Sequence, residues 1–186
     1  MISTRIKETT KEAHQQLEKK VVLKIKAIDS PADYAAFLKY FFAYFNVVEK
    51  AVAPYITTLL TDYDKRRNAS YLKADIEELG ATIEMLPYAQ APSIHNAAEA
   101  IGAMYVLEGS IMGGPYIVQM LQKRGIEKGF SFFSGYGADS GRMWKAFQDV
   151  LNETGANEAA GLQIMQKAAE TFARFGHVFE MNVVEN

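Results

Sequence analysis

Residues 103–121 constrain the fold most, because they combine a helical pattern with residues that disfavour helix. Apolar side chains recur at helical spacing, yet the middle contains Gly109, Gly113, Gly114 and Pro115. An interior glycine costs about 1 kcal/mol relative to alanine, and an interior proline about 3 kcal/mol. Glycine is useful where another helix packs closely or where a flat ligand lies on the backbone. Gly109 and Gly113 share one helix face, and the proline predicts a kink.

The rest of the chain also has helical spacing, and no convincing period-2 strand occurs. Ser3 and Ser93 are the expected N-caps of the first helix and of the glycine-containing helix. Other expected helices cover roughly residues 31–60, 72–79, 142–151 and 157–179, with a polar connection at 61–70 and a loop with apolar anchors at 125–141. This pattern predicts an all-α fold, a helical bundle in a single domain over residues 1–186.

Composition excludes several classes of function. The chain has 186 residues and a net charge of −2, which argues against nucleic acid or an anionic membrane as partner. It has no cysteine, so disulfides, thiolate metal sites and cysteine nucleophiles are excluded. No signal-peptide pattern and no apolar run of about 18 residues is present. We expect a cytoplasmic protein, monomeric by default.

Sequence motifs remove other kinds of chemistry and leave the histidines as candidates. There is no nucleophile elbow, no P-loop, no dinucleotide-binding glycine pattern and no Glu-x-x-His pair of a di-iron site. Lys7, Lys11 and His14 share one helix face, which is either an ordinary solvated basic surface or a site for a metal and carboxylates. His95 is expected at the surface, and His177 is expected to be a core histidine.

Two stretches resemble a known family. Residues 7–18 (KETTKEAHQQLE) resemble the start of haem oxygenases, where a basic helix carries the proximal iron ligand. Residues 104–114 (MYVLEGSIMGG) resemble the family's distal helix, especially in bacterial, biliverdin-producing members. The similarity extends over most of the chain in the family's order of helices, and it implies a haem-oxygenase-like bundle with a kinked, glycine-rich distal helix.

The resemblance also implies a reaction and its participants. Haem is both cofactor and substrate, and the ring is cleaved oxidatively to biliverdin, carbon monoxide and ferrous iron. Dioxygen and an electron donor, a ferredoxin or a flavin reductase, are the other partners. The neutral imidazole of His14 would bind the iron, and Lys7 and Lys11 would attract the haem propionates.

On the distal side the resemblance assigns the remaining residues. Gly109, Gly113 and Gly114 would let the backbone lie against the haem. Ser110 occupies a position where many members have an aspartate, and its hydroxyl can hold a water but carries no charge. Tyr116 would line the pocket, as would Phe172. Arg174, or alternatively Lys167, would supply a further cation for the propionates.

Three other functions are compatible with the sequence. A haem-binding protein that stores or senses haem also needs His14 but not a productive distal side. Another ligand-binding member of the same helical fold would bind, for example, a thiamine-type pyrimidine and would not need the face of Lys7, Lys11 and His14. A helical interaction domain would use its glycines for packing alone.

Overall fold

The computed structural model describes residues 1–180, and this part of the chain is built from helices without a β-strand. The all-α prediction is therefore confirmed. The elements are α1 (Ile2–Thr9), α2 (Lys11–Lys26), α3 (Pro31–Leu59), the 3-10 turn η1 (Tyr63–Lys65), α4 (Ala69–Glu78), α5 (Ala97–Gln122), the 3-10 turn η2 (Gly137–Asp139), α6 (Ser140–Thr154) and α7 (Glu158–Val178). None of these helices is long and apolar enough to cross a membrane.

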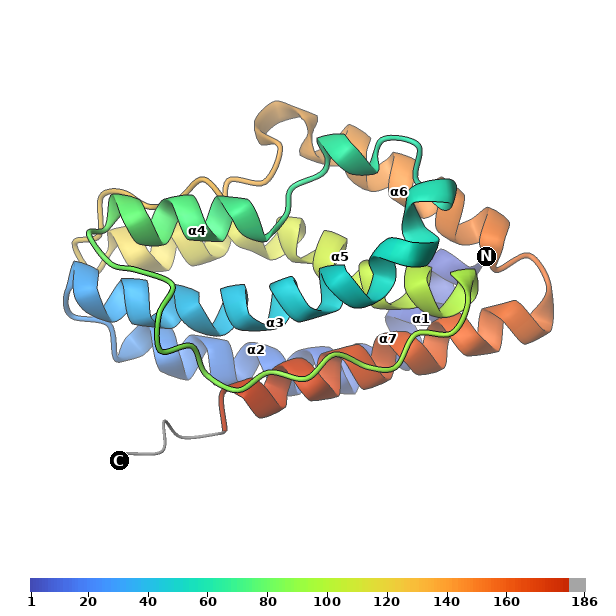
Figure 1. Ribbon diagram of the computed structural model, residues 1–186, viewed down its shortest axis with the longest axis horizontal. Coiled ribbons are helices and arrows are strands. Elements are labelled where there is room, and N and C mark those ends of the chain that lie inside the picture. The colour runs from blue at the N-terminus through green and yellow to red at the C-terminus, as the bar shows by residue number, and fades with distance from the viewer. Residues whose placement is uncertain (181–186) are drawn as a thin grey trace.

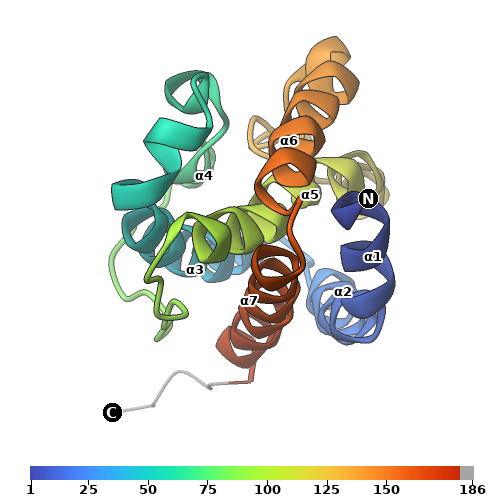
Figure 2. The same ribbon diagram turned by 90° about the vertical axis from the view of Figure 1, so that its right-hand side faces the viewer.

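The helix α5 lies in the middle of the molecule. In the end-on view, α3 lies on one side of it, α6 above it and α7 below it (Figure 2). The helices α1 and α2 lie beyond α7, and α4 covers α3 on the outside (Figures 1 and 2). Packing thus surrounds α5 on several sides, and the part that remains uncovered is limited to one face.

Side-chain caps set the starts of the long helices. At the start of α3 the Ser30 hydroxyl accepts the Asp33 amide at 3.1 Å, and Pro31 follows as the first helical residue, a position that proline favours. The predicted start of α5 at Ser93 is wrong, because Asn96 caps this helix by accepting the Glu99 amide at 2.9 Å. The Glu99 carboxylate reaches back to the amide of His95 at 2.7 Å, which completes a capping box.

The first predicted helix is two helices in the structure. It begins at Ile2, so Ser3 is not its cap, and Thr10 separates α1 from α2 with φ −94° and ψ 0°. Backbone hydrogen bonds continue across the break, from the Thr10 amide to Ile6 and from the His14 amide to Thr10, each at 2.9 Å. The break is therefore a local bend, and it places Lys7 on a different helix from His14.

Aromatic side chains join α3 to α7. Phe41 meets Phe175 edge-to-face at 5.0 Å between ring centroids, and Tyr44 stacks on the same ring at 4.6 Å. The Tyr44 hydroxyl donates to the Thr171 carbonyl at 2.5 Å. The inner face of α3 is therefore aromatic, and it fixes the position of α7 on which the candidate site depends.

The loop between α5 and α6 is held firmly against the bundle. Phe132 and Phe133 are fully buried, as the predicted apolar anchors require. The Asp75 carboxylate of α4 accepts the amides of Ser131 and Phe132, both at 2.9 Å. This loop forms a fixed surface against which one side of α5 packs.

Candidate functional site

One face of α5 is left uncovered by the packing around it. Most of the helix is buried, but Met112 is 53% exposed and Tyr116 is 70% exposed. Gly113 is exposed between them, and Gly109 is half-buried one turn earlier. These positions recur at intervals of three and four residues, so they form one continuous face. The structure therefore brings both distal glycines and Tyr116 to the same surface.

Close packing accounts for two other glycines of α5. A Cβ atom at Gly102 would lie 2.5 Å from the carbonyl oxygen of Ile164 in α7. A Cβ atom at Gly114 would lie only 2.0 Å from the carbonyl oxygen of Phe133 in the loop before α6. Both distances are far below van der Waals contact. Gly114, expected at the ligand, is thus directed at the protein itself.

Packing does not account for Gly109 and Gly113. A Cβ atom at Gly109 would make ordinary contact with the Trp144 ring, at 3.7 Å. A Cβ atom at Gly113 would meet no atom within 4 Å. Each glycine weakens the helix by about 1 kcal/mol relative to alanine, and at Gly113 no neighbouring side chain or backbone requires it. The open space above Gly113 is the feature expected of a ligand that approaches the backbone.

The side chain of His14, on α2, is exposed and lies against an aromatic ring. Its imidazole meets Phe172 of α7 edge-on, with 5.5 Å between ring centroids. Tyr105, which belongs to the open face of α5, meets the same ring at 6.5 Å. Lys7 and Lys11 are both exposed near His14 in the sequence. Phe172 thus connects the histidine of α2 with the glycine face of α5.

Two further aromatic residues belong to this site. Trp144 of α6 lies 5.8 Å from the Tyr105 ring, and it is the residue that a Cβ at Gly109 would touch. Helical spacing alone does not distinguish Trp144 from an ordinary packing residue, and the signal available in the sequence is that it is the only tryptophan. Burial raises the pKa of Tyr105, while a hydrogen bond with Thr10 at the α1–α2 bend lowers it in part.

Ser110 lies at the edge of the open face, about 60° around α5 from Gly113, and the protein binds its hydroxyl. Its hydroxyl donates to the Leu107 carbonyl at 2.6 Å and accepts from the Arg67 guanidinium at 2.5 Å. Consecutive residues are separated by about 100° around a helix, so Ser110 lies beside the open face rather than at its centre. The hydroxyl retains one free lone pair.

A buried ion pair lies behind α5, where the sequence predicted only a polar connection. Arg66 and Glu108 are each about 1% exposed, and their closest N–O distance is 2.6 Å. Asp62 also pairs with Arg66 at 2.9 Å, and the Tyr136 hydroxyl donates to Glu108 at 3.0 Å. The signal for this pair was Glu108, a carboxylate in the apolar middle of α5, because such a group needs a buried cation.

A half-buried carboxylate lines a cavity of about 220 Å³ behind α5. Glu49 of α3 lines it together with Tyr63, Arg67 and Met104. The Glu49 carboxylate accepts the Ala69 amide at 2.9 Å. Burial raises its pKa to about 7, so this group titrates near neutral pH.

The two basic candidates of α7 are engaged elsewhere. The Arg174 Nε donates to Glu170 at 2.8 Å, and Arg174 lies about 200° around the helix from Phe172. Lys167 donates to the Ser93 carbonyl at 2.7 Å and pairs with Glu170 at 3.0 Å. The structure does not bring either side chain to His14.

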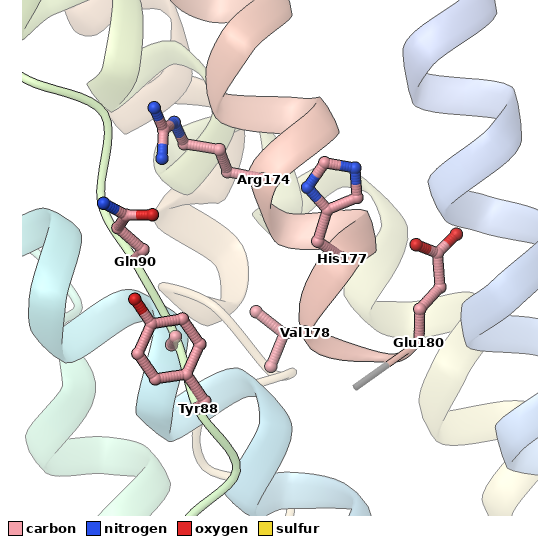
Figure 3. Close-up of a pocket in the computed structure, with 7 residues that line it drawn as sticks. Tyr88, Gln90, Arg174, His177, Val178 and Glu180 are labelled. Atoms are coloured by element: carbon pink, nitrogen blue, oxygen red, sulfur yellow. The ribbon is translucent and has the colours of Figure 1, made fainter. Parts of the chain in front are cut away.

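Arg174 instead lines a separate cavity of about 250 Å³ with Tyr88, Gln90 and His177. Figure 3 shows Arg174 beside the segment that carries Gln90 and Tyr88, while Glu180 lies on the other side of the helix end. His177 is exposed, so its prediction as a core histidine is wrong. His95 is exposed as predicted.

Comparisons with known proteins point to one family. A family model for heme oxygenase matches residues 1–181. A heme oxygenase from Xanthomonas campestris pv. campestris is 30% identical over 130 residues, covering 68% of this chain and 76% of its own. Heme oxygenase PigA from Pseudomonas aeruginosa is 24% identical over 181 residues, covering 96% of this chain and 91% of its own. The NO- and CO-bound heme oxygenase of Neisseria meningitidis has the same fold, with a TM-score of 0.81 and 21% identity over 97% of this chain and 90% of its own.

Proposed function

The chain belongs to the haem oxygenase family and is an enzyme that degrades haem, and we propose that it converts haem to biliverdin, carbon monoxide and ferrous iron. Dioxygen and an external electron donor, a ferredoxin or a flavin reductase, are the co-reactants. We propose that residues 1–186 act as a single domain and as a monomer. When bound, haem would supply the iron and its oxygen chemistry. The chain would supply the iron ligand, shape the haem site and position a water that carries protons.

The open face of α5 carries this proposal. Gly113 has no protein neighbour within 4 Å of a Cβ position, so a planar molecule can lie directly on the backbone there. The exposed Met112 and Tyr116 extend the same face with apolar surface. An apolar ring system placed on this surface would remove both side chains from water, which favours binding.

His14 is the proposed iron ligand. Its imidazole is exposed on α2, so it can approach a metal without breaking the core. The Phe172 ring, edge-on at 5.5 Å, restricts its orientation. A neutral imidazole is a common axial ligand of haem iron, and the rigid aromatic neighbour keeps the ring available on the side of the α5 face.

Lys7 and Lys11 are the proposed partners of the haem propionates. Both are exposed, and Lys11 lies one helical turn before His14. A lysine ammonium pairs with carboxylates at modest energetic gain when both remain in water, roughly 0–1 kcal/mol per pair. The lysines would therefore orient the haem more than they would bind it. Arg174 is not included, because it pairs with Glu170 in a different cavity.

Ser110 is the proposed holder of a distal water. Its only proton is donated to the Leu107 carbonyl, and Arg67 occupies one lone pair. The remaining lone pair accepts a hydrogen bond from a water, whose second proton then points toward the substrate. In this arrangement the serine positions the water without donating a proton itself.

A hemin titration followed by reduction in air tests the proposed function. One hemin per chain should produce a saturating Soret band, and reductant should replace it with the red absorption of biliverdin and release carbon monoxide. Catalase is included in the assay, because it removes the peroxide that degrades haem without enzymatic control. A Soret band that survives reduction with an electron donor would contradict ring opening and favour haem carriage.

A further inference from the structure

Arg67 is a buried cation that the proposed reaction does not yet use. Its side chain follows η1 and is 5% exposed. The guanidinium donates to three oxygen atoms, those of the Leu107 carbonyl at 2.9 Å, the Phe132 carbonyl at 3.0 Å and the Ser110 hydroxyl at 2.5 Å. Burial of this charge is costly, and within residues 1–180 the guanidinium hydrogen-bonds neither of the carboxylates that favour its charged form, Glu108 and Glu49.

The neighbouring Arg66 shows the difference. It pairs with Glu108 at 2.6 Å and Asp62 at 2.9 Å, and so its charge is neutralised locally. Within residues 1–180, the contacts of the Arg67 guanidinium are with neutral oxygen atoms and with the Phe132 ring at 3.9 Å. Burial lowers the pKa of Arg67 to about 10, which still leaves it charged at neutral pH.

The three contacts of Arg67 join α5 to the loop that supports it. Leu107 and Ser110 stand on either side of Gly109, and they are also linked to each other through the Ser110 hydroxyl at 2.6 Å. Glycine leaves the backbone more freedom than other residues, and Pro115 removes one helical hydrogen bond further along. Arg67 binds residues before and after Gly109. It therefore restrains α5 in the segment where glycine makes the helix least stable.

We propose that Arg67 is a positioning residue for haem degradation, which fixes the Ser110 hydroxyl and the backbone at Gly109 from behind the distal helix. This inference rests on the proposed function. In an interior of low dielectric constant the charge of Arg67 is weakly screened, so it also favours negative charge on the distal side of the bound haem. Arg67 acts through Ser110 and the helix and does not touch the substrate itself.

The surroundings of Arg67 provide a way to restore the cation from solution. Its Nε is buried without a hydrogen-bond partner in the described structure, and the residue lines the cavity of about 220 Å³ that also contains Glu49. Truncation of Arg67 would enlarge this cavity. A free guanidinium ion fits such a space and offers the same donors to Leu107 and Ser110.

The test compares ferric haem complexes of the wild type, Arg67→Lys, Arg67→Ala and Ser110→Ala. The pH midpoint for ionisation of the haem-bound water, followed by absorption, should rise by about 0.5 to 1 unit when the arginine is truncated. Arg67→Ala should also lose about tenfold in kcat with little change in haem affinity, and millimolar guanidinium should restore both values in part. Arg66→Lys serves as the control for perturbing a buried arginine, and its midpoint should stay at the wild-type value.

The two lysine variants and Ser110→Ala keep the test informative if Arg67→Ala does not fold. Because Arg67 acts through Ser110, the double variant Arg67→Lys/Ser110→Ala should shift the midpoint no further than the larger single effect. Unchanged midpoints and rates in folded, haem-loaded Arg67→Lys and Arg67→Ala would overturn the inference while leaving the proposed function intact. Failure of the wild type to bind haem would overturn both.

Discussion

Gly113 and Gly114 are adjacent in α5, but a side chain would have open space at the first position and would collide with the protein at the second. A Cβ atom on Gly113 would meet no atom within 4 Å, whereas one on Gly114 would lie 2.0 Å from the carbonyl oxygen of Phe133. Packing against the loop therefore requires glycine at position 114. No contact within the protein requires glycine at position 113. The pair therefore separates the structural role of glycine in this helix from its proposed role at the substrate.

Gly114→Ala should destabilise the protein. The added methyl group would collide with backbone that Asp75 holds through two hydrogen bonds, so the loop cannot easily move away. Such overpacking costs typically about 1–3 kcal/mol. Urea unfolding of the apo-protein measures this loss, with Gly141→Ala as a control at a position with open space. Equal stability of the two variants would show that the α5–loop packing is not as tight as described.

His14→Ala should remove the axial ligand while leaving the apo-protein folded. Because His14 is exposed, its loss should change the free energy of unfolding by no more than about 0.5 kcal/mol. The ferric haem spectrum should change and turnover should be lost, and added imidazole should restore the wild-type spectrum. His95→Ala is the matched control on an exposed histidine outside the site. Full turnover with an unaltered spectrum in His14→Ala would exclude it as the ligand.

The raised pKa of Glu49 predicts that the free energy of unfolding depends on pH. Its pKa is raised from 4.5 to about 7 in the folded protein, because burial disfavours the charged form. The folded state therefore holds this proton more tightly than the unfolded state does. The resulting stabilisation is fully present below pH 4.5 and is lost as the pH rises through about 7, with an upper limit of about 3 kcal/mol.

Glu49→Gln should remove this pH dependence, since the amide stays neutral and can still accept the Ala69 amide. Free energies of unfolding at pH 5 and pH 8 should differ less in this variant than in the wild type. Glu127→Gln, an exposed position, should retain the wild-type difference. If Glu49→Gln keeps the full difference, the carboxylate does not titrate as its burial indicates.

The sequence predicted the helices well because their signals are local. The aromatic spacing from Tyr34 to Phe45 and the Ser30-Pro31 start describe α3 without knowledge of its neighbours. Local patterns failed where two signals compete, as at the start of α5, where Asn96 and not Ser93 provides the cap. The bend at Thr10 has no proline or glycine, so no residue in the sequence marks it.

The site was only partly predictable, because it depends on contacts between distant segments. The shared face of Gly109 and Gly113 follows from helical spacing, but the distinction between Gly113 and Gly114 needs the position of Phe133. Arg66 and Arg67 lie in a polar stretch, and only the fold buries them behind α5. Arg174 was assigned by resemblance, and its orientation toward Gln90 depends on how α7 packs.

Hemin titration of Gly113 variants tests the central claim, that the open face of α5 receives the haem, most directly. Gly113→Ala should stabilise the apo-protein by up to about 1 kcal/mol, since alanine favours helix and meets no neighbour. Gly113→Leu should weaken hemin binding by about tenfold or more, which corresponds to about 1.4 kcal/mol, because its side chain fills the space above the backbone. A folded Gly113→Leu protein that binds hemin with wild-type affinity would contradict the account.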